Sequence, residues 1–312
     1  MRVATIDIGT NTVLLLVAEA GADGTLEPIL ERATITRLGQ GVDKTKALAP
    51  EALARTTTCI DAYADLILAH GVTAIDVVGT SAMRDAAGGA DLAAYVKNKL
   101  GVPARVISGE EEARLTFEGA LVGLNVGPRA TVFDIGGGST EVVQGTCASP
   151  TADARVEFAV SYDMGSVRMT ERHLHHDPPT SEECAQATAD IDAIAKTLPP
   201  LAQGERPVAI AGTMTTLAAI AIDLAPYDSA RIHGLELEVA TLVATTERLL
   251  RLPLAERRNV RGLEPKRADV IVGGALVATR LLKRWGAERV TFSDRGVRWG
   301  LALALCKRAA TM

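Results

Sequence analysis

One plan occurs twice in this chain, as Ile6-Asp7-Ile8-Gly9-Thr10-Asn11-Thr12 and as Phe133-Asp134-Ile135-Gly136-Gly137-Gly138-Ser139-Thr140-Glu141. In each stretch a β-rich apolar run meets an acidic residue and a glycine-containing turn, and a second β-rich run follows. Glycine lets the backbone approach a phosphate, the N–H groups and hydroxyls of the turn can bind its oxygens, and the Asp can hold a divalent cation. The repeat predicts two hairpins that face each other and clamp a phosphorylated ligand.

The bulk composition is that of a globular protein. The 312 residues are 47% hydrophobic and 23% charged, which suffices for two domains with substantial cores and excludes the disordered and fibrous classes. The apolar runs are far shorter than the ~20 residues of a membrane span, and no secretory signal opens the chain. We therefore expect a soluble, cytoplasmic protein that binds neither membranes nor nucleic acid.

The cysteines indicate no disulfide framework or zinc site. They are scattered and include no Cys-x-x-Cys pair: Cys59, Cys147, Cys184 and Cys306. We expect reduced, mostly buried thiols.

The charge is unevenly distributed along the chain. The net charge is −5, yet residues 247–308 hold fifteen Lys or Arg and six Asp or Glu. A local basic surface suits a polyanionic ligand. The favoured interpretation is plainer: Arg248, Arg251 and Arg258 fall at helical spacing, as on solvated helix faces.

The order of elements predicts a duplicated α/β fold with mixed sheets. Each half opens with a strand hairpin and continues as alternating helices and strands, and a cleft between the halves is the expected active site. Strands are expected at 3–8, 13–20, after the turn at 21–24, and at 74–78, 104–107, 130–146, 155–162, 208–211 and 289–292. Helices are expected at 50–69, 91–100, 108–124, 166–175, 181–198, 213–225, 236–251, 266–285 and 296–309.

Three acidic residues are candidate metal ligands. Asp7 and Asp134 each stand where a strand meets a glycine turn, and Glu141 follows Asp134 by seven residues. An Asp at such a place often caps its own turn, which would explain a single occurrence. Two matching contexts favour a divalent-metal and phosphate site.

The run Gly136-Gly137-Gly138-Ser139 is a candidate phosphate-binding turn. A flexible loop is the alternative, but the β-forming flanks argue for a tight hairpin. Three glycines exceed what a turn needs unless a ligand must approach the backbone, and phosphate is the natural candidate.

Ser108 begins a helix whose first turn holds three carboxylates. Ser108 and Glu111 form a capping box, and Glu110 can pair with Arg114 four residues on. Glu112 is left without a structural task. Phosphate anions nearby would make it a better proton acceptor, so it could deprotonate a water aimed at phosphorus.

Several weaker motifs follow strands or end helices. Thr80-Ser81 with Arg84, and Ala211-Gly212-Thr213 at a helix start, could each bind phosphate or simply cap a helix. The cluster His173, His175, His176 and Asp177 precedes two prolines at an expected helix end, where cationic His is favourable. A structural role is therefore favoured there over metal binding.

Together these motifs resemble the exopolyphosphatase and guanosine pentaphosphate phosphatase family, within the superfamily of sugar kinases, heat-shock chaperone ATPases and actin. The resemblance spans essentially the whole chain. It rests on residues 7–12, 79–84, 107–114, 134–141, 211–213 and 293–298.

The resemblance implies two RNase-H-like domains, 1–124 with the C-terminal helix 297–312, and 125–296. It implies an Mg²⁺- or Mn²⁺-dependent hydrolase that releases terminal orthophosphate from inorganic polyphosphate. It also implies that the enzyme is a homodimer. Glu112 would be the catalytic base, and Asp7, Asp134 and Glu141 the metal ligands. The implied phosphate-binding residues are Thr10, Asn11, Arg84, Gly136, Gly137, Gly138, Ser139, Gly212, Thr213 and Arg298.

Larger relatives carry a C-terminal helical domain that lengthens the polyphosphate channel, whereas this chain stops at Met312. We therefore expect a preference for short polyphosphates and strong weakening by salt. The nearest alternative is hydrolysis of guanosine pentaphosphate or nucleoside triphosphates. More distant alternatives are a sugar or acetate kinase and an actin-like polymer or nucleotide-sensing scaffold.

Overall fold

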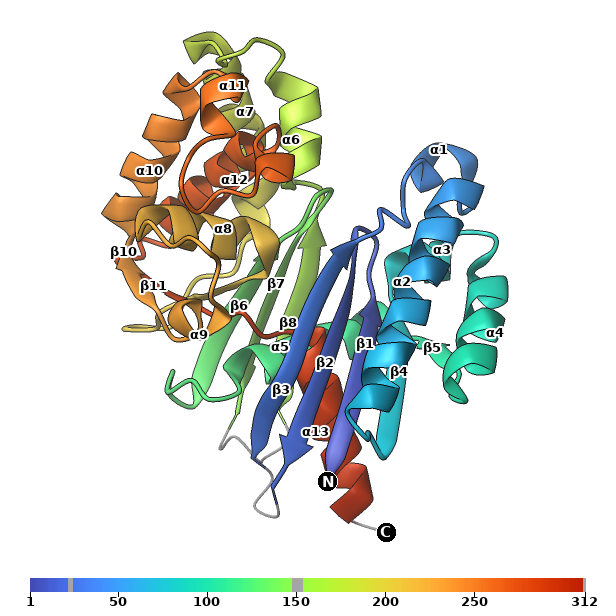
Figure 1. Ribbon diagram of the computed structural model, residues 1–312. Coiled ribbons are helices and arrows are strands. Elements are labelled where there is room, and N and C mark those ends of the chain that lie inside the picture. The colour runs from blue at the N-terminus through green and yellow to red at the C-terminus, as the bar shows by residue number, and fades with distance from the viewer. Residues whose placement is uncertain (22–24, 148–153, 311–312) are drawn as a thin grey trace. The chain divides into compact units, whose positions relative to one another are not determined.

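The computed structural model describes residues 1–21, 25–147 and 154–310 (Figure 1). Within it the chain forms two compact units, Met1–Gly119 with Val297–Met312, and Ala120–Gly296. Residues 22–24 of the expected turn at 21–24 lie outside the described residues. The domain boundaries inferred from the sequence, and the cleft expected between the halves, stay predictions.

The first unit is built on a five-stranded mixed sheet of order β3-β2-β1-β4-β5. β1, β2 and β3 are antiparallel neighbours, whereas β1, β4 and β5 run parallel. Its strands are β1 (Arg2–Ile8), β2 (Thr12–Ala20), β3 (Leu26–Ile35), β4 (Ala74–Gly79) and β5 (Ala104–Val106). Its helices are α1 (Val42–Thr45), α2 (Pro50–Ala69), α3 (Ser81–Asp85), α4 (Gly89–Leu100), α5 (Gly109–Leu121, which runs into the second unit) and α13 (Val297–Ala310).

The second unit repeats this plan with one strand added. Its sheet has the order β10-β11-β9-β6-β7-β8, with β6, β7 and β8 antiparallel and β6, β9 and β11 parallel. Its strands are β6 (Arg129–Ile135), β7 (Thr140–Thr146), β8 (Arg155–Tyr162), β9 (Val208–Ile210), β10 (Glu236–Glu238) and β11 (Arg289–Phe292). Its helices are α6 (Ser166–His173), α7 (Ser181–Ile194), η1 (Ala195–Thr197), α8 (Ala211–Ala221), α9 (Ser229–Ile232), α10 (Val239–Arg251), α11 (Leu254–Arg257), η2 (Pro265–Arg267) and α12 (Ile271–Arg284).

Strand β1 is buried on both faces, one against the core that includes α2 and the other against α13. Ala4, Ile6 and Ile8 join the core cluster that includes residues of α2. Thr5 lies on the opposite face, where its Oγ1 donates to the Arg298 carbonyl of α13 (2.8 Å). Because strand side chains alternate, Asp7 shares the α13 face with Thr5.

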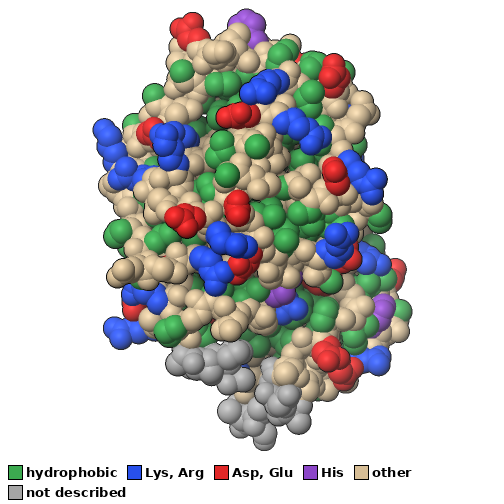
Figure 2. All heavy atoms as spheres, turned by 90° about the vertical axis from the view of Figure 1, so that its left-hand side faces the viewer, with side chains coloured by type: hydrophobic (Ala, Val, Ile, Leu, Met, Phe, Trp, Pro, Cys, Tyr) green, Lys and Arg blue, Asp and Glu red, His purple; other side chains and the backbone are tan. Residues whose placement is uncertain are grey.

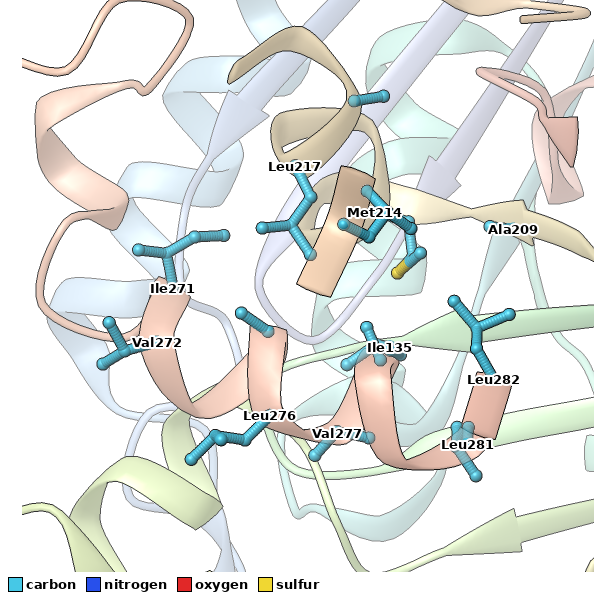
Figure 3. Packing of buried hydrophobic residues seen from close by; sticks show 14 of the residues in the cluster. Ile135, Ala209, Met214, Leu217, Ile271, Val272, Leu276, Val277, Leu281 and Leu282 are labelled. Carbon is cyan, nitrogen blue, oxygen red and sulfur yellow. The ribbon is translucent and has the colours of Figure 1, made fainter. Parts of the chain in front are cut away.

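The second core is centred on α12. Its apolar side chains pack with Met214 and Leu217 of α8, Ile135 of β6 and Ala209 of β9 (Figure 3). Ile135 and Phe133 alternate with Asp134, so the strand that buries these two apolar residues presents the carboxylate on its other face.

The expected alternation of strands and helices is confirmed, but one strand was predicted as helix, and the helix expected from residue 266 begins only at Ile271, after a 3-10 turn. Residues 236–238 were expected to begin a helix, but they form strand β10. β10 pairs antiparallel with β11, Leu237 opposite Val290. Pairing with an existing sheet edge outweighs the local helical pattern, and α10 begins at Val239 instead.

The expectation of free thiols is confirmed, but the expectation that they are mostly buried is wrong. All four are free thiols, of which Cys59 is buried and the others are partly exposed. Among the described residues, no helix has the length and apolar character that crossing a membrane requires.

Candidate active site

In the first unit, Asp7 is a buried carboxylate at the end of β1. The residue is 8% exposed, and its Oδ1 has no hydrogen-bond partner among the described residues. Burial raises the pKa of Asp7 to about 7; repulsion from Glu112 adds to this, and the Arg298 guanidinium acts in the opposite direction. A buried, incompletely satisfied carboxylate is costly for the fold unless a cation or proton joins it.

We expect Asp7→Asn to stabilise the metal-free protein above neutral pH. A folded-state pKa above the ordinary value of 3.8 means that the native state retains a proton that the unfolded chain has lost between about pH 4 and 7. The contribution of Asp7 to wild-type stability therefore falls as pH rises through this window. Asp7→Asn should match wild type near pH 4 and exceed its free energy of unfolding at pH 8 by roughly 1–4 kcal/mol, in urea denaturation with EDTA.

The control for this prediction is Asp65→Asn, on the exposed side of α2. As an exposed surface substitution, it should leave the free energy of unfolding at pH 8 within about 0.5 kcal/mol of wild type. Parallel curves of unfolding free energy against pH for Asp7→Asn and wild type would contradict a raised pKa of Asp7 in the folded state.

The turn after Asp7 is held by the segment that follows β3. Gly9 N–H donates to Thr12 O (3.1 Å), and a side chain on Gly9 would place Cβ 2.9 Å from that oxygen. Gly39 N–H donates to Thr10 O (2.8 Å), while the N–H groups of residues 36 and 37 donate to Asn11 O. Within the described residues the N–H groups of Thr10 and Asn11 donate no hydrogen bond, so both are available to an anion.

Glu112 and Arg84 lie together in this unit. The Glu112 Oε2 is 3.5 Å from Arg84 Nη1, and each side chain is about one-third exposed (31% and 34%). Arg84 Nη1 also donates to Ile107 O (2.9 Å), which anchors the guanidinium. Thr10 Oγ1 and Ser81 Oγ are 2.7 Å apart, so the hydroxyls of the turn and of α3 also meet.

The first turn of α5 differs in part from the expected pairing. Ser108 Oγ does accept the Glu111 N–H (3.1 Å), but the Glu111 carboxylate pairs with Arg105 (3.0 Å). The expected Glu110–Arg114 pair is wrong, because Arg114 pairs forward along the helix with the buried Glu118 (3.1 Å). Glu112 therefore remains the carboxylate of this turn that faces Asp7 and Arg84.

Arg298 lies on the interior side of Asp7. Its side chain is 10% exposed, and its Nη2 and Nε donate to Glu31 Oε2 (2.6 and 3.1 Å). Trp299 Nε1 donates to the same oxygen (3.2 Å). This burial favours an electrostatic role beneath Asp7, and phosphate binding by Arg298 stays a prediction.

In the second unit, the glycine turn is fastened to the start of α6. Gly136 O accepts from Ser166 N (2.9 Å), and Gly137 O accepts from Val167 N and Arg168 N (2.8 and 3.1 Å). Gly138 O accepts from Arg168 Nε (2.6 Å). Three consecutive carbonyls thus point toward α6.

Peptide planarity then decides where the amides of this turn point. In a trans peptide the N–H points away from the C=O of the same plane. The N–H groups of Gly137, Gly138 and Ser139 therefore point away from α6, and they donate no hydrogen bond within the described residues. Successive amides directed to one side form an anion-binding nest, the geometry that a phosphate requires.

The second carboxylate pair is set by strand register. Asp134 on β6 lies directly opposite Glu141 on β7, so both side chains occupy the same face of the sheet. Ser161 of β8 continues the row and donates to Glu141 Oε1 (2.7 Å). The equivalent position to Glu141 in the first hairpin is Leu14, which faces Asp7, so the repeat is not chemically symmetric.

Gly212 and Thr213 lie at the start of α8, where other residues of the second unit cover them. A Cβ on Gly212 would lie 2.2 Å from Arg267 Nη1, so the guanidinium rests directly on the glycine backbone. Thr213 is 5% exposed and packs against Gly274 of α12. Ala211 has a left-handed φ of 64°, an unusual conformation for a residue with a side chain.

The histidine cluster is divided among separate partners. His173 Nε2 lies 2.9 Å from Asp190, His176 Nδ1 lies 2.8 Å from Glu183, and Asp177 pairs with the buried Arg257 (3.1 Å). These contacts support the structural interpretation. Across the described part of the chain, no three His, Cys, Asp or Glu side chains come together as a ready-made metal cage.

Many of the basic residues in 247–308 form ion pairs with Asp or Glu. On the face that Figure 2 shows, Lys and Arg are interspersed with Asp and Glu. This arrangement favours the solvated-surface interpretation over a continuous polyphosphate path. The paired arginines are Arg251 with Glu247, Arg257 with Asp177, Arg267 with Glu264, Arg280 with Asp192, Arg289 with Glu236, Arg298 with Glu31 and Arg308 with Asp76.

Two basic residues of the candidate site were missed from the sequence. Arg168 supports the glycine turn, and Arg267 covers Gly212. Neither belongs to a motif that signals phosphate binding. Arg267 could have been noticed only as one of many arginines in the basic segment.

Two mixed α/β units of one plan, each with an Asp-x-Gly hairpin turn, define the two-domain fold of the actin-like ATPase superfamily. The sequence model of the Ppx/GppA phosphatase family matches residues 16–309. The chain belongs to this family, as its motifs led us to expect, and it is therefore a phosphatase-class enzyme.

Individual relatives agree along nearly the whole chain. The chain is 40% identical to "Exopolyphosphatase 2" of Mycobacterium tuberculosis, covering 97% of this chain and 98% of that protein. It is 31% identical to "Exopolyphosphatase 1" of Mycobacterium bovis, over 97% and 88% of the two chains. The crystal structure of the Aquifex aeolicus member of the Ppx/GppA family superposes with a TM-score of 0.86 at 32% identity, over 99% and 98%.

Proposed function

We propose that this protein is an exopolyphosphatase, which releases terminal orthophosphate from inorganic polyphosphate. The observation that carries the proposal is the row of three outward amides at Gly137, Gly138 and Ser139. It follows directly on β6, which carries Asp134 opposite Glu141. The names of the two mycobacterial relatives support polyphosphate as the substrate.

Mg²⁺ or Mn²⁺ is the proposed cofactor, and the residues fit such a hard cation in their donor chemistry. Mg²⁺ is commonly held by one or two carboxylates together with substrate phosphates and water. Asp134 and Glu141 share one sheet face, and Asp7 has a buried oxygen without a hydrogen-bond partner among the described residues. When bound, the cation would neutralise the charge of the terminal phosphates.

The chain's own groups would carry the rest of the reaction. The amides of residues 137–139 would hold phosphate oxygens, with Thr10, Asn11 and Arg84 as further ligands. Glu112 would orient a water molecule and accept its proton as the water oxygen attacks the terminal phosphorus. The bond from that phosphorus to the bridging oxygen would break, and the penultimate phosphate would depart with that oxygen. Most of the acceleration would come from positioning and charge stabilisation.

The test is orthophosphate release from tripolyphosphate, long polyphosphate, guanosine pentaphosphate and ATP, each with and without Mg²⁺. Fastest release from a polyphosphate supports the proposal. A clear preference for guanosine pentaphosphate would instead assign the guanosine pentaphosphate phosphatase activity that the motif resemblance left as the nearest alternative, and a preference for ATP would assign a nucleoside triphosphatase. Release from none of the four would reopen the kinase and filament interpretations.

We expect polyphosphate hydrolysis to weaken strongly with salt. The proposed binding groups are backbone amides and arginines acting on a polyanion, and monovalent salt screens such interactions. Raising NaCl from 50 to 500 mM should increase KM about tenfold or more while kcat changes little. The same assay on chains of increasing length tests the expected preference for short polyphosphates.

A salt-independent KM would contradict electrostatic capture of the substrate.

A homodimeric assembly remains part of the proposal, and light scattering after size-exclusion chromatography would test it.

A further inference from the structure

We propose that Arg168 is a positioning residue that orients the phosphate-binding turn, an inference that rests on the proposed function. It reaches the turn from α6 in two ways. Its backbone N–H donates to Gly137 O (3.1 Å), and its side-chain Nε donates to Gly138 O (2.6 Å). The first of these contacts is available to any residue, whereas the second needs this side chain.

The side-chain bond acts on one particular peptide plane. Ser166 and Val167 fasten the first two carbonyls of the turn through their backbone amides. The Gly138 carbonyl lies beyond the reach of these contacts and is held by Arg168 Nε. Since the Ser139 N–H belongs to the same plane as the Gly138 carbonyl, Arg168 determines the direction of the third outward amide.

The remainder of the guanidinium is also held in place. Arg168 Nη2 lies 3.4 Å from Asp163 Oδ1, and the Arg168 side chain is 35% exposed. A Cβ on Gly138 would lie 3.5 Å from Nη2, which is ordinary van der Waals contact, so guanidinium and turn pack closely without strain. The geometry therefore sets a planar donor against an otherwise flexible Gly-Gly-Gly segment, and restricts it to the conformation that binds phosphate.

Three substitutions separate orientation from charge. Arg168→Gln places an amide nitrogen at the position of Nε, which keeps the donor and removes the charge. Arg168→Lys keeps the charge but puts a methylene where Nε donates. Arg168→Met fills a similar volume and supplies neither donor nor charge.

Binding of a methylene-bridged triphosphate analogue, measured by calorimetry, is the main readout, because the analogue cannot be hydrolysed. We expect Arg168→Met to weaken its binding about tenfold, the effect of losing one charge-assisted hydrogen bond. Arg168→Gln should recover most of that loss, and Arg168→Lys less. KM for tripolyphosphate should follow the same order, with the thermal midpoint of all three variants close to wild type.

The alternatives give different patterns. If Arg168 acted only through its charge, Lys would recover binding and Gln would not. If it were merely structural, the thermal midpoint would fall while the folded fraction bound the analogue as wild type does. Either pattern overturns the inference.

The same experiment separates this inference from the proposed function. Wild type that releases phosphate from polyphosphate while Arg168→Met binds the analogue equally well overturns the inference alone. Wild type that binds the analogue but hydrolyses no polyphosphate overturns the proposed function alone, provided that Met weakens binding and Gln restores it. Wild type that neither binds the analogue nor hydrolyses polyphosphate overturns both.

Discussion

Glu112→Gln is expected to reduce kcat for polyphosphate by about 10² or more, with little change in substrate affinity. Glu112 stands in the first turn of α5, about one-third exposed and 3.5 Å from Arg84, and close enough to Asp7 to raise the pKa of that carboxyl. Glutamine keeps the shape and can still orient water, but it cannot accept the proton. The measurement is steady-state phosphate release, together with calorimetric binding of the non-hydrolysable triphosphate analogue.

The matched control is Glu110→Gln, two residues earlier in the same turn. Glu110 is exposed and is not the partner of Arg114, which pairs with Glu118. This change removes an equal charge from the same helix start, so it should alter kcat by less than about twofold. Equal losses in the two variants would show a general field effect, and near-normal turnover of Glu112→Gln would remove Glu112 from the role of base.

Gly165→Ala is expected to have the second-largest effect, because it would push the phosphate-binding turn away from α6. A Cβ on Gly165 would lie 2.5 Å from Gly137 O and 2.7 Å from Gly138 C. These are backbone atoms, which cannot rotate away as the end of a side chain can. A displacement near 1 Å of a group that positions the substrate can reduce kcat/KM about 10²-fold.

The same overlap should lower the free energy of unfolding by about 1–3 kcal/mol, the usual cost of overpacking. Urea denaturation measures this loss, and phosphate release measures the catalytic loss. Gly109→Ala provides the control for stability, because no atom outside its chain neighbours and its own helix backbone lies within 4 Å of the added Cβ. Retention of wild-type kcat/KM by Gly165→Ala would contradict the tight docking of the turn on α6.

The sequence was informative where local chemistry suffices. Asp-x-Gly turns between β-forming runs predicted both hairpins, and their repetition predicted the duplicated mixed-sheet plan that the structure confirms. Helix boundaries were predicted less accurately. Residues 236–238 formed a strand because an edge of the second sheet was available to pair with them, which their own pattern does not reveal.

The candidate site was predictable only in part. The residues of the glycine turn could be named, but the direction of their amides depends on α6, whose supporting residues begin some thirty positions later. Arg298 shows the opposite case. The resemblance implied a phosphate ligand, which stays a prediction, and the structure adds an ion pair with Glu31 of β3 that its motif does not reveal.

The sequence by itself determined the repeated hairpins, the α/β class and the family, because turn chemistry, strand alternation and motif spacing are local properties of the chain. Only the tertiary structure decided which charges are left for chemistry. It buried Asp7 without a partner for Oδ1 among the described residues, paired Arg298 with Glu31, and directed three amides outward by fastening their carbonyls to α6. The physical reason is that burial, ion pairing and peptide orientation depend on contacts between segments far apart in sequence.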